Sequence, residues 1–502
     1  MKPVDVADYT IAVIGAGAMG QGIAQVAVQG GVKTLLFDAK PGGAAAGREQ
    51  IMKRIDRLVE KERISADEAK AAGDRLGTVD SIAALSSCDA VIEAVFENLE
   101  VKTDVFKEVE AVVSDDCIIA SNTSSIPIAS LAQACKKRDR VAGMHFFNPV
   151  PLMKLVEVIR ASDTSDETVA ALTELGKRMT RVPVTVADMP GFLVNMGGRA
   201  FSSEALRIVH EGVATPAQVD AVMRDCRHFR MGPFELMDLT GIDVNFPASM
   251  IIYNGYIQDP RIKTSPLHEA IFNSGRWGRK TSAGWYNYEN GQMVDPPSPD
   301  HETDAAPASH VSLAEPSDAL SDFCKSMGIT VKEEDDGSAP ILAAPVGDDA
   351  THTSLMCDVD FKRLVCVDLS CDTSKRVTIM TAPGADPAAR DAVAASLKAA
   401  GRAVTAIKDS PGFIAQRMCA MIANLGCYMA EVNLATPSDI DLAMKLGLNY
   451  PLGPLELGED MTTENTLEIL ERLQELTGED RYRPTQWLSR RALLDLPIHT
   501  PS

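Results

Sequence analysis

Residues 10–38 read TIAVIGAGAMGQGIAQVAVQGGVKTLLFD and determine the fold that we expect for the first part of the chain. An apolar run precedes a glycine-rich turn, and further apolar residues follow the turn at helical spacing. The three glycines allow a sharp turn, a close approach of backbone to a pyrophosphate and tight packing of a helix on a sheet. This pattern predicts that a phosphate-containing ligand binds at Gly15, Ala16, Gly17, Ala18, Met19 and Gly20.

Asp38 ends this stretch, directly after the second apolar run, TLLF. A carboxylate in that place can accept hydrogen bonds from an adenosine ribose, and its charge disfavours a 2′-phosphate. The sequence therefore predicts a Rossmann-type α/β domain that binds NAD rather than NADP.

The overall composition limits the possible classes of partner. A chain of 502 residues is long enough for several domains, and its net charge of -21 argues against nucleic acid or an anionic membrane as the main partner. The ten cysteines include no C-x-x-C pair, which indicates reduced thiols, a cytoplasmic protein and no metal site. We expect neither a signal peptide, since residues 1–10 have no apolar core, nor a membrane span.

Polar side chains follow successive apolar segments of the predicted sheet. Glu97 comes after the run 90–95, Asn122 and Ser124 come after CIIAS, and Asn148 follows RVAGMHFF. Because the carboxyl ends of parallel strands meet at one crevice, we expect these side chains to face a common cleft.

His145 lies at the end of one of these segments, and Glu157 lies in the next apolar segment, KLVEVI. A histidine beside aromatic residues can be a purely structural group. A carboxylate in an apolar strand needs a partner, however, and an imidazole would supply one. Such a pair orients the ring and suits it to remove a proton near neutral pH, so we predict that His145 is a general base.

Basic residues cluster in the charged helical stretch 48–75, where Arg54 and Lys61 lie near Lys53, Arg57 and Arg63. A solvated helical face and a binding surface for a nucleotide-carrying substrate are both compatible with this pattern.

Composition changes divide the chain further. Residues after Pro190-Gly191 read as helices, and residues 291–316 are rich in Pro, Asp, Ser and Ala. We therefore expect a nucleotide domain at 1–187, a helical domain at 188–290, a linker at 291–316, a small α/β domain at 317–408 and a second helical domain at 409–502.

An internal repeat supports this division. At one constant offset, DMPGF at 188–192 matches DSPGF at 409–413, and MGPFEL at 231–236 matches LGPLEL at 452–457. The same offset places Cys366, Thr378 and Gln416 opposite His145, Glu157 and Asn195, although loops could shift the first two. No glycine triplet precedes the second copy, so we predict a degenerate Rossmann-like domain and a catalytically silent duplicate.

Taken together, these residues resemble the 3-hydroxyacyl-CoA dehydrogenase family. The resemblance covers residues 10–288 and is carried by GAGAMG with Asp38, FENLEVK, SNTSS, HFFNPVPLMKLVEV, DMPGFLVN and GRKTSAGWYNY. A chain of this length with a reduced second half looks like the long bacterial members, which act on 3-hydroxybutyryl-CoA in fatty acid β-oxidation or on 3-hydroxyadipyl-CoA in phenylacetate breakdown.

The resemblance implies NAD-dependent oxidation of an (S)-3-hydroxyacyl-CoA to the 3-oxoacyl-CoA. It implies that His145 is the base, that Glu157 orients it, and that Ser124 and Asn195 position the substrate. Further implied contacts to NAD are Glu97, Lys102, Asn122, Asn148 and Lys280, and implied contacts to coenzyme A are Arg54 and Lys61.

Two other functions stay open at this point. A dehydrogenase of a free 3-hydroxy acid would have a lysine base in the helical domain, and a non-catalytic protein would bind NAD(H) without turnover. Single-copy members of the family dimerise through the helical domain, so the duplicate either replaces that contact within one chain or adds to a homodimer.

Overall fold

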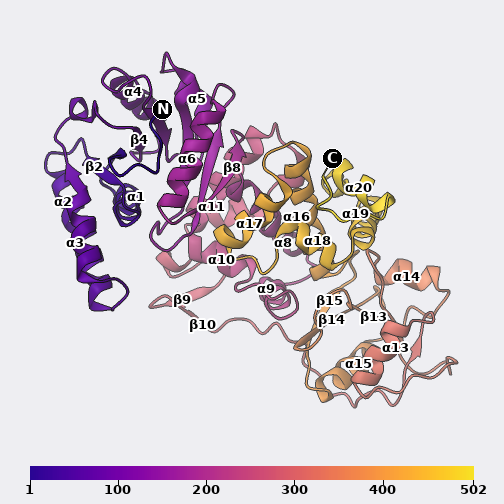
Figure 1. Ribbon diagram of the computed structural model, residues 1–502. Coiled ribbons are helices and arrows are strands. Elements are labelled where there is room, and N and C mark those ends of the chain that lie inside the picture. Colours follow the sequence, from indigo (N-terminus) through magenta and orange to yellow (C-terminus); the bar gives the residue numbers. More distant parts are fainter. Residues whose placement is uncertain (502) are drawn as a thin grey trace. The chain divides into compact units, whose positions relative to one another are not determined.

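The computed structural model describes residues 1–501 (Figure 1). The chain divides into two compact units. Unit 1 comprises Met1–Met196 and Asn433–Leu448, and unit 2 comprises Gly197–Val432 and Asn449–Ser502. Residues 433–448, which the sequence assigns to the second helical domain, thus belong to the same unit as the glycine-rich turn. No helix in the described part of the chain has the length and apolarity needed to span a membrane.

Unit 1 is built on an eight-stranded sheet with the order β3-β2-β1-β4-β5-β6-β7-β8. Neighbouring strands are parallel except for the antiparallel pair β6 and β7. The strands are β1 (Thr10–Ile14), β2 (Lys33–Phe37), β3 (Leu76–Thr78), β4 (Ala90–Glu93), β5 (Ile118–Ser121), β6 (Val141–Phe146), β7 (Leu155–Arg160) and β8 (Val182–Ala187). The central strands are buried on both faces, as expected for a parallel sheet that helices cover.

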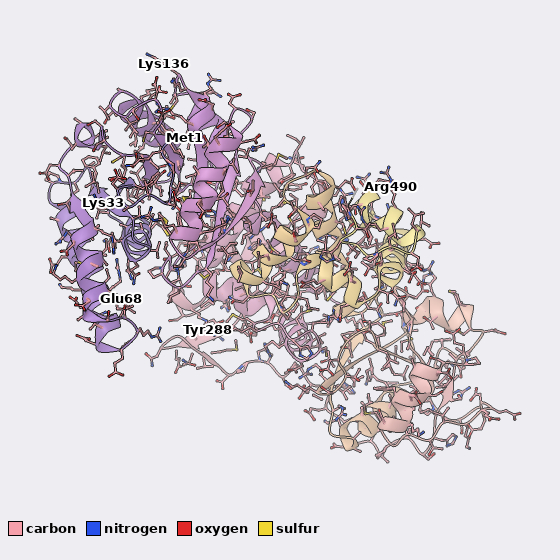
Figure 2. All side chains as sticks on the ribbon, in the orientation of Figure 1. Met1, Lys33, Glu68, Lys136, Tyr288 and Arg490 are labelled. Carbon is pink, nitrogen blue, oxygen red and sulfur yellow. The ribbon has the colours of Figure 1, made fainter. Side chains whose placement is uncertain are left out.

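Helices alternate with these strands. They are α1 (Ala18–Gln29), α2 (Gly43–Glu60), α3 (Ala66–Arg75), η1 (Ile82–Leu85), α4 (Leu99–Glu110), α5 (Ile128–Ala132), η2 (Arg138–Arg140), α6 (Asp166–Arg178), α7 (Val194–Gly197) and α17 (Pro437–Leu448). Side chains at the helix ends satisfy free backbone N–H groups: Ser65 and Glu68, which is labelled in Figure 2, form a reciprocal capping box at α3. The predicted Rossmann-type domain is confirmed.

Unit 2 contains the helical part of the chain and a second sheet. Its helices are α8 (Arg199–His210), α9 (Pro216–Asp225), α10 (Pro233–Thr240), α11 (Ile242–Gly255), η3 (Pro260–Ile262), α12 (Pro266–Asn273), η4 (Arg279–Thr281), α13 (Asp318–Ser326), α14 (Ala350–Met356), α15 (Pro387–Ala399), α16 (Ile414–Glu431), α18 (Pro454–Asp460), α19 (Thr463–Thr477), η5 (Asp480–Tyr482) and α20 (Gln486–Leu493). The helical domain expected after the nucleotide domain is thus confirmed.

The second sheet has five strands in the order β11-β12-β13-β14-β15. A separate hairpin joins β9 (Asn287–Glu289) to β10 (Gln292–Val294), and the sheet comprises β11 (Ser312–Leu313), β12 (Ile341–Ala343), β13 (Leu364–Val367), β14 (Arg376–Thr381) and β15 (Ala403–Lys408). The range expected to be a linker, 291–316, therefore contains two short strands.

The second sheet corrects one expectation about the repeat. Strands β13 and β14 are antiparallel, with Val367 opposite Ile379, and Asp368 N–H donates to Thr378 O at 3.0 Å. Asp368 rather than Cys366 therefore lies across from Thr378. The constant offset does not hold here because the connection from 368 to 378 is shorter than the connection from 145 to 157.

A buried ionic network joins α8 to α16 within unit 2. The Arg417 guanidinium pairs with Glu204 at 2.8 Å and donates to Tyr482 Oη at 2.8 Å, and Arg417 and Glu204 are almost completely buried. Arg481 pairs with the second oxygen of Glu204 at 3.2 Å. Removing one member of such a network leaves an incompletely compensated buried charge, which is costly.

We therefore predict that Arg417→Met lowers the free energy of unfolding of unit 2 by about 3 kcal/mol. All three tryptophans (Trp277, Trp285 and Trp487) lie in this unit, so urea denaturation followed by tryptophan fluorescence measures the change. Arg483→Met, which removes an exposed arginine paired with Asp480, is the control and should cost less than about 1 kcal/mol. Equal losses in the two variants would contradict the importance of the buried network.

Candidate active site

The glycine-rich turn between β1 and α1 has the geometry of a phosphate site. Gly15 has a φ of +105°, and a Cβ there would lie 2.5 Å from Ala94 O, while a Cβ at Gly20 would lie 1.8 Å from Gly15 O. Gly17, the N-cap of α1, has no atom within 4 Å of its Cβ position and caps the helix with no side chain. The helix N-terminus therefore offers free N–H groups and open space to an anion.

Asp38 follows β2 and holds the turn in place. Its Oδ2 accepts a hydrogen bond from Ala16 N–H at 2.7 Å, and its Oδ1 accepts one from Lys40 N–H at 2.9 Å. The acid thus stands beside the glycine-rich turn, as a dinucleotide with a free ribose requires. The residues present fit NAD.

Glu97 accepts several hydrogen bonds from the turn that follows β5. Its Oε1 accepts hydrogen bonds from Thr123 Oγ1 at 2.6 Å, Ser124 N at 3.0 Å, and Ser125 N and Oγ at 3.1 and 3.0 Å. Burial favours a raised pKa for this carboxyl, but the Thr123 hydroxyl, the charge of Lys102 and the serine donors outweigh it and hold the pKa of Glu97 below its usual value. Glu97 therefore orders the backbone that carries Ser124.

Lys102 and Glu93 form a buried pair beneath this turn. Lys102 Nζ lies 2.8 Å from Glu93 Oε1 and 3.3 Å from Glu97 Oε2, and both residues of the buried pair are 1% exposed. Glu93 also accepts hydrogen bonds from Ser121 Oγ at 2.7 Å and Val95 N–H at 2.6 Å. Glu93 was not among the predicted site residues, although a glutamate inside the apolar segment AVIEAV is the signal that could have identified it.

Asn122 connects the ends of neighbouring strands. Its Oδ1 accepts a hydrogen bond from Phe146 N–H at 2.8 Å, which fixes the end of β6 directly after His145. Asn148 follows shortly afterwards at the exposed end of this segment. Glu97, Asn122, Ser124 and Asn148 thus follow strand ends, and His145 is the penultimate residue of β6, while a common cleft for these side chains stays a prediction.

His145 on β6 and Glu157 on β7 lie directly opposite each other in the antiparallel pair. His145 Nδ1 and Glu157 Oε2 are 2.6 Å apart, and Glu157 is completely buried. Since a carboxylate can only accept, Nδ1 carries the proton and Nε2 keeps a free lone pair. The rings of Phe147 and Phe192 lie 4.6 and 5.9 Å from the imidazole and limit its rotation.

The second oxygen of Glu157 is bound by backbone. Glu157 Oε1 accepts hydrogen bonds from Leu193 N–H at 3.2 Å and Val194 N–H at 2.8 Å. These N–H groups belong to the start of α7, and Asn195 is the next residue. The carboxylate therefore links the imidazole to the segment that carries Asn195.

A cavity of about 590 Å³ lies beside α1 in unit 1. Its polar lining includes Arg54, Arg57, Arg63, Arg181 and Asn148.

Arg54 is held in this cavity by two glutamines. Its Nε donates to Gln25 Oε1 at 2.9 Å and its Nη1 donates to Gln21 Oε1 at 3.1 Å. Its Nη2 is buried and has no hydrogen-bond partner among residues 1–501. An arginine stays charged at any ordinary pH, so this guanidinium keeps one unused donor at the cavity.

Two predicted residues, Lys61 and Lys280, have other surroundings. Lys61 is the exposed C-cap of α2 and does not line the cavity. Lys280 belongs to unit 2, where it forms an ion pair with Asp243.

The segment that contains Lys280 is anchored by a buried acid in unit 2. Asp238 accepts hydrogen bonds at 3.0 Å from Trp285 N–H, Tyr286 N–H and the hydroxyl of Tyr288, which is labelled in Figure 2.

Comparison with known proteins gives a consistent result over nearly the whole chain. Residues 10–189 match the model of the 3-hydroxyacyl-CoA dehydrogenase NAD binding domain, and residues 191–288 and 412–496 match that of the 3-hydroxyacyl-CoA dehydrogenase C-terminal domain. The chain is 37% identical to the 3-hydroxyadipyl-CoA dehydrogenase of Escherichia coli strain K12, over 97% of this chain and 98% of that protein. It is 39% identical to a probable 3-hydroxybutyryl-CoA dehydrogenase of Deinococcus radiodurans, over 55% of this chain and 99% of that protein.

A crystal structure titled 3-hydroxybutyryl-CoA dehydrogenase from Escherichia coli K12 is similar along the chain. It matches with a TM-score of 0.84 and 35% identity, and the match covers 97% of this chain and 98% of that one.

The choice between NAD and NADP can be tested by changing the carboxylate of Asp38. We predict that Asp38→Asn lowers the ratio of kcat/KM with NADH to kcat/KM with NADPH by at least roughly tenfold, because an amide neither accepts a ribose hydrogen bond as strongly nor repels a 2′-phosphate. Absorbance at 340 nm with acetoacetyl-CoA measures both rates. Asp56→Asn on the exposed side of α2 is the control, and an unchanged ratio in Asp38→Asn would remove Asp38 from cofactor selection.

Proposed function

Since this chain belongs to the 3-hydroxyacyl-CoA dehydrogenase family and uses NAD, we propose that it oxidises an (S)-3-hydroxyacyl-CoA to the 3-oxoacyl-CoA with His145 as general base. The observation that carries this proposal is the buried hydrogen bond of 2.6 Å between His145 Nδ1 and Glu157 Oε2. NAD, when bound, accepts the hydride from C3 of the substrate.

His145 removes the proton from the C3 hydroxyl through Nε2. The carboxylate of Glu157 holds the Nδ1–H tautomer and stabilises the imidazolium that forms as the proton is transferred. The two backbone N–H groups at Leu193 and Val194 keep this carboxylate oriented, so the pair reacts without reorganising.

Ser124 and Asn195 are the proposed positioning groups for the C3 oxygen and the thioester carbonyl. Glu97 fixes the backbone of Ser124, and Asn195 follows the backbone that binds Glu157. Both side chains are therefore attached to backbone that the site itself orders, which favours a single substrate orientation.

The coenzyme A part of the substrate is proposed to occupy the cavity lined by Arg54. Coenzyme A carries a diphosphate and a 3′-phosphate, and the unsatisfied Nη2 of Arg54 can donate to one of these oxygens. Lys61, at the exposed end of the same helix, would then contact the ligand from solvent. The proposed contacts to NAD are the glycine-rich turn, Asp38, Glu97, Asn122, Asn148 and Lys280, while Lys102, whose Nζ is buried against Glu93 and Glu97, is proposed to act through Glu97.

Two acyl groups are candidates. The relative that matches 97% of the chain is named for 3-hydroxyadipyl-CoA, and the similar crystal structure is titled for 3-hydroxybutyryl-CoA. The two substrates differ in a terminal carboxylate, and steady-state kcat/KM with each of them distinguishes a role in phenylacetate breakdown from one in short-chain β-oxidation.

We further propose that the second half is a duplicate of the first. The family model of the C-terminal domain matches two segments, and residues that the repeat makes equivalent adopt the same uncommon backbone. The residues with positive φ in both copies are Thr180 and Gly401, Gly191 and Gly412, Phe192 and Phe413, Gly212 and Asn433, His228 and Asn449, and Gly241 and Thr462.

In each copy, the last residue of a strand also donates a backbone hydrogen bond to a loop residue of the other copy. Ala187 N–H donates to Leu434 O at 2.8 Å, and Lys408 N–H donates to Val213 O at 3.1 Å. The constant offset of the repeat relates Ala187 to Lys408 and Val213 to Leu434. Such reciprocity is typical of a symmetric dimer interface, which supports the replacement of a partner subunit by the second half.

The second copy lacks the reacting groups. Asp368 and Thr378 stand where His145 and Glu157 stand in the first copy, and Gln416 Nε2 donates to Asp368 Oδ1 at 3.2 Å. Burial raises the pKa of Asp368, but neither residue of this pair offers an imidazole as a base. We propose that this half is catalytically silent.

We also propose a cytoplasmic location, supported by the ten free thiols of residues 1–501, which a reducing compartment maintains.

The first prediction of this mechanism concerns His145. His145→Gln should lower kcat for acetoacetyl-CoA reduction by at least about a hundredfold, the usual contribution of a general acid or base, with little change in NADH binding. Absorbance at 340 nm and NADH fluorescence measure the two quantities. His352→Gln, at a partly exposed position in unit 2, is the control, and near-normal turnover in His145→Gln would refute the mechanism.

The second prediction of this mechanism concerns Arg54. Arg54→Met should raise KM for acetoacetyl-CoA by roughly tenfold, the effect of losing one charge-assisted hydrogen bond, with kcat nearly unchanged. Lys53→Met, which removes a charge on the adjacent exposed position, serves as the control. If both variants leave KM unchanged, coenzyme A does not use this cavity.

A further inference from the structure

Helix α17 comes from the second half of the chain and packs on β7 and β8 in unit 1 (orange in Figure 1). At its penultimate residue, Gly447, a Cβ would lie 3.0 and 3.1 Å from the two methyl groups of Val194 and 3.2 Å from Leu155 Cδ2. Both neighbours are buried, so they have little room to move. Any side chain at residue 447 would therefore press on these two residues.

Gly447 provides space rather than an unusual backbone conformation. It lies inside a helix and is not among the residues with positive φ. Glycine is a poor helix former, and alanine would be preferred there if space allowed. In the proposed repeat, residue 447 corresponds to Cys226, which has a side chain and contacts Arg376 instead of a catalytic segment.

The two residues that Gly447 contacts lead directly to the catalytic carboxylate. Val194 donates its N–H to Glu157 Oε1 at 2.8 Å, and Leu155 precedes Glu157 by two positions on β7, so their side chains share one face of the sheet. Valine is branched at Cβ, and both of its methyl groups face Gly447, so a change of rotamer replaces only one of them with hydrogen and leaves the other methyl against residue 447. The backbone of Val194 would have to shift, and with it the donor to Glu157.

We infer that α17, through Gly447, is a positioning element for the His145–Glu157 pair. The second half, which we propose to be silent, thus supplies a helix that packs against the segment that holds the carboxylate and carries Asn195. This inference depends on the proposed role of His145 and Glu157, and it adds to the same site a residue from the far end of the sequence.

The test is a size series at residue 447 with purified, folded protein. Gly447→Ala should lower kcat for acetoacetyl-CoA reduction several-fold and Gly447→Val roughly tenfold or more, since small displacements at a reacting centre are costly. The dissociation constant of NADH should stay within about twofold, because the glycine-rich turn is untouched. Adding Val194→Ala to Gly447→Ala removes the opposing methyl groups and should restore much of kcat.

Gly458→Ala is the matched control for a purely structural effect. Gly458 lies in α18, and its Cβ would be 2.6 Å from Ile498 Cδ1 and 3.0 Å from Ala423 Cβ, so the variant should lose stability but keep kcat. A normal kcat in folded Gly447→Val, or no recovery in the double variant, would overturn the inference. His145→Gln separates the two levels: if it too is active, the proposed mechanism itself is wrong.

Discussion

The hydrogen bond between His145 and Glu157 is the interaction on which the arrangement of the candidate site in unit 1 depends. A carboxylate with no solvent exposure is unfavourable unless its oxygens are bound, and Glu157 meets this condition with one imidazole and two backbone N–H groups. The antiparallel pairing of β6 and β7 places the two side chains directly opposite each other, at the one point where the sheet departs from its parallel order. The segment after β8 then places the N–H groups of Leu193 and Val194 within hydrogen-bond distance of Glu157 Oε1.

A second set of hydrogen bonds does the same for the neighbouring strand ends. Lys102 and Glu93 are buried together, Glu97 lies above them, and Glu97 collects the N–H and O–H donors of the turn that carries Ser124. The polar groups at the strand ends are therefore ordered by the protein before any ligand binds. Such preorganisation is what electrostatic catalysis requires, because the groups need not reorient when charge develops.

The Rossmann fold was predictable, and the main site residues could be proposed, because both depend on local patterns: glycines at fixed spacing, an acid after the second strand, and polar residues after apolar runs. Glu93 was missed although the apolar segment AVIEAV carries its signal, and Arg181 was not predicted because the lining of the cavity depends on which loops are neighbours in space. The constant offset places Cys366 opposite His145 only if no loop changes length, and the structure has Asp368 across from Thr378 because the connection between these two strands is shorter than that from 145 to 157. The packing of α17 in unit 1 was also beyond the sequence, since a repeat does not reveal which copy its helices contact.

The most direct test of the account is a crystal structure of the enzyme with NADH and acetoacetyl-CoA bound. We predict that His145 Nε2 lies within about 3.2 Å of the C3 oxygen, or one water molecule away from it, while Nδ1 keeps its bond to Glu157. A well-ordered complex in which another side chain contacts that oxygen and His145 Nε2 is remote from it would contradict the central claim.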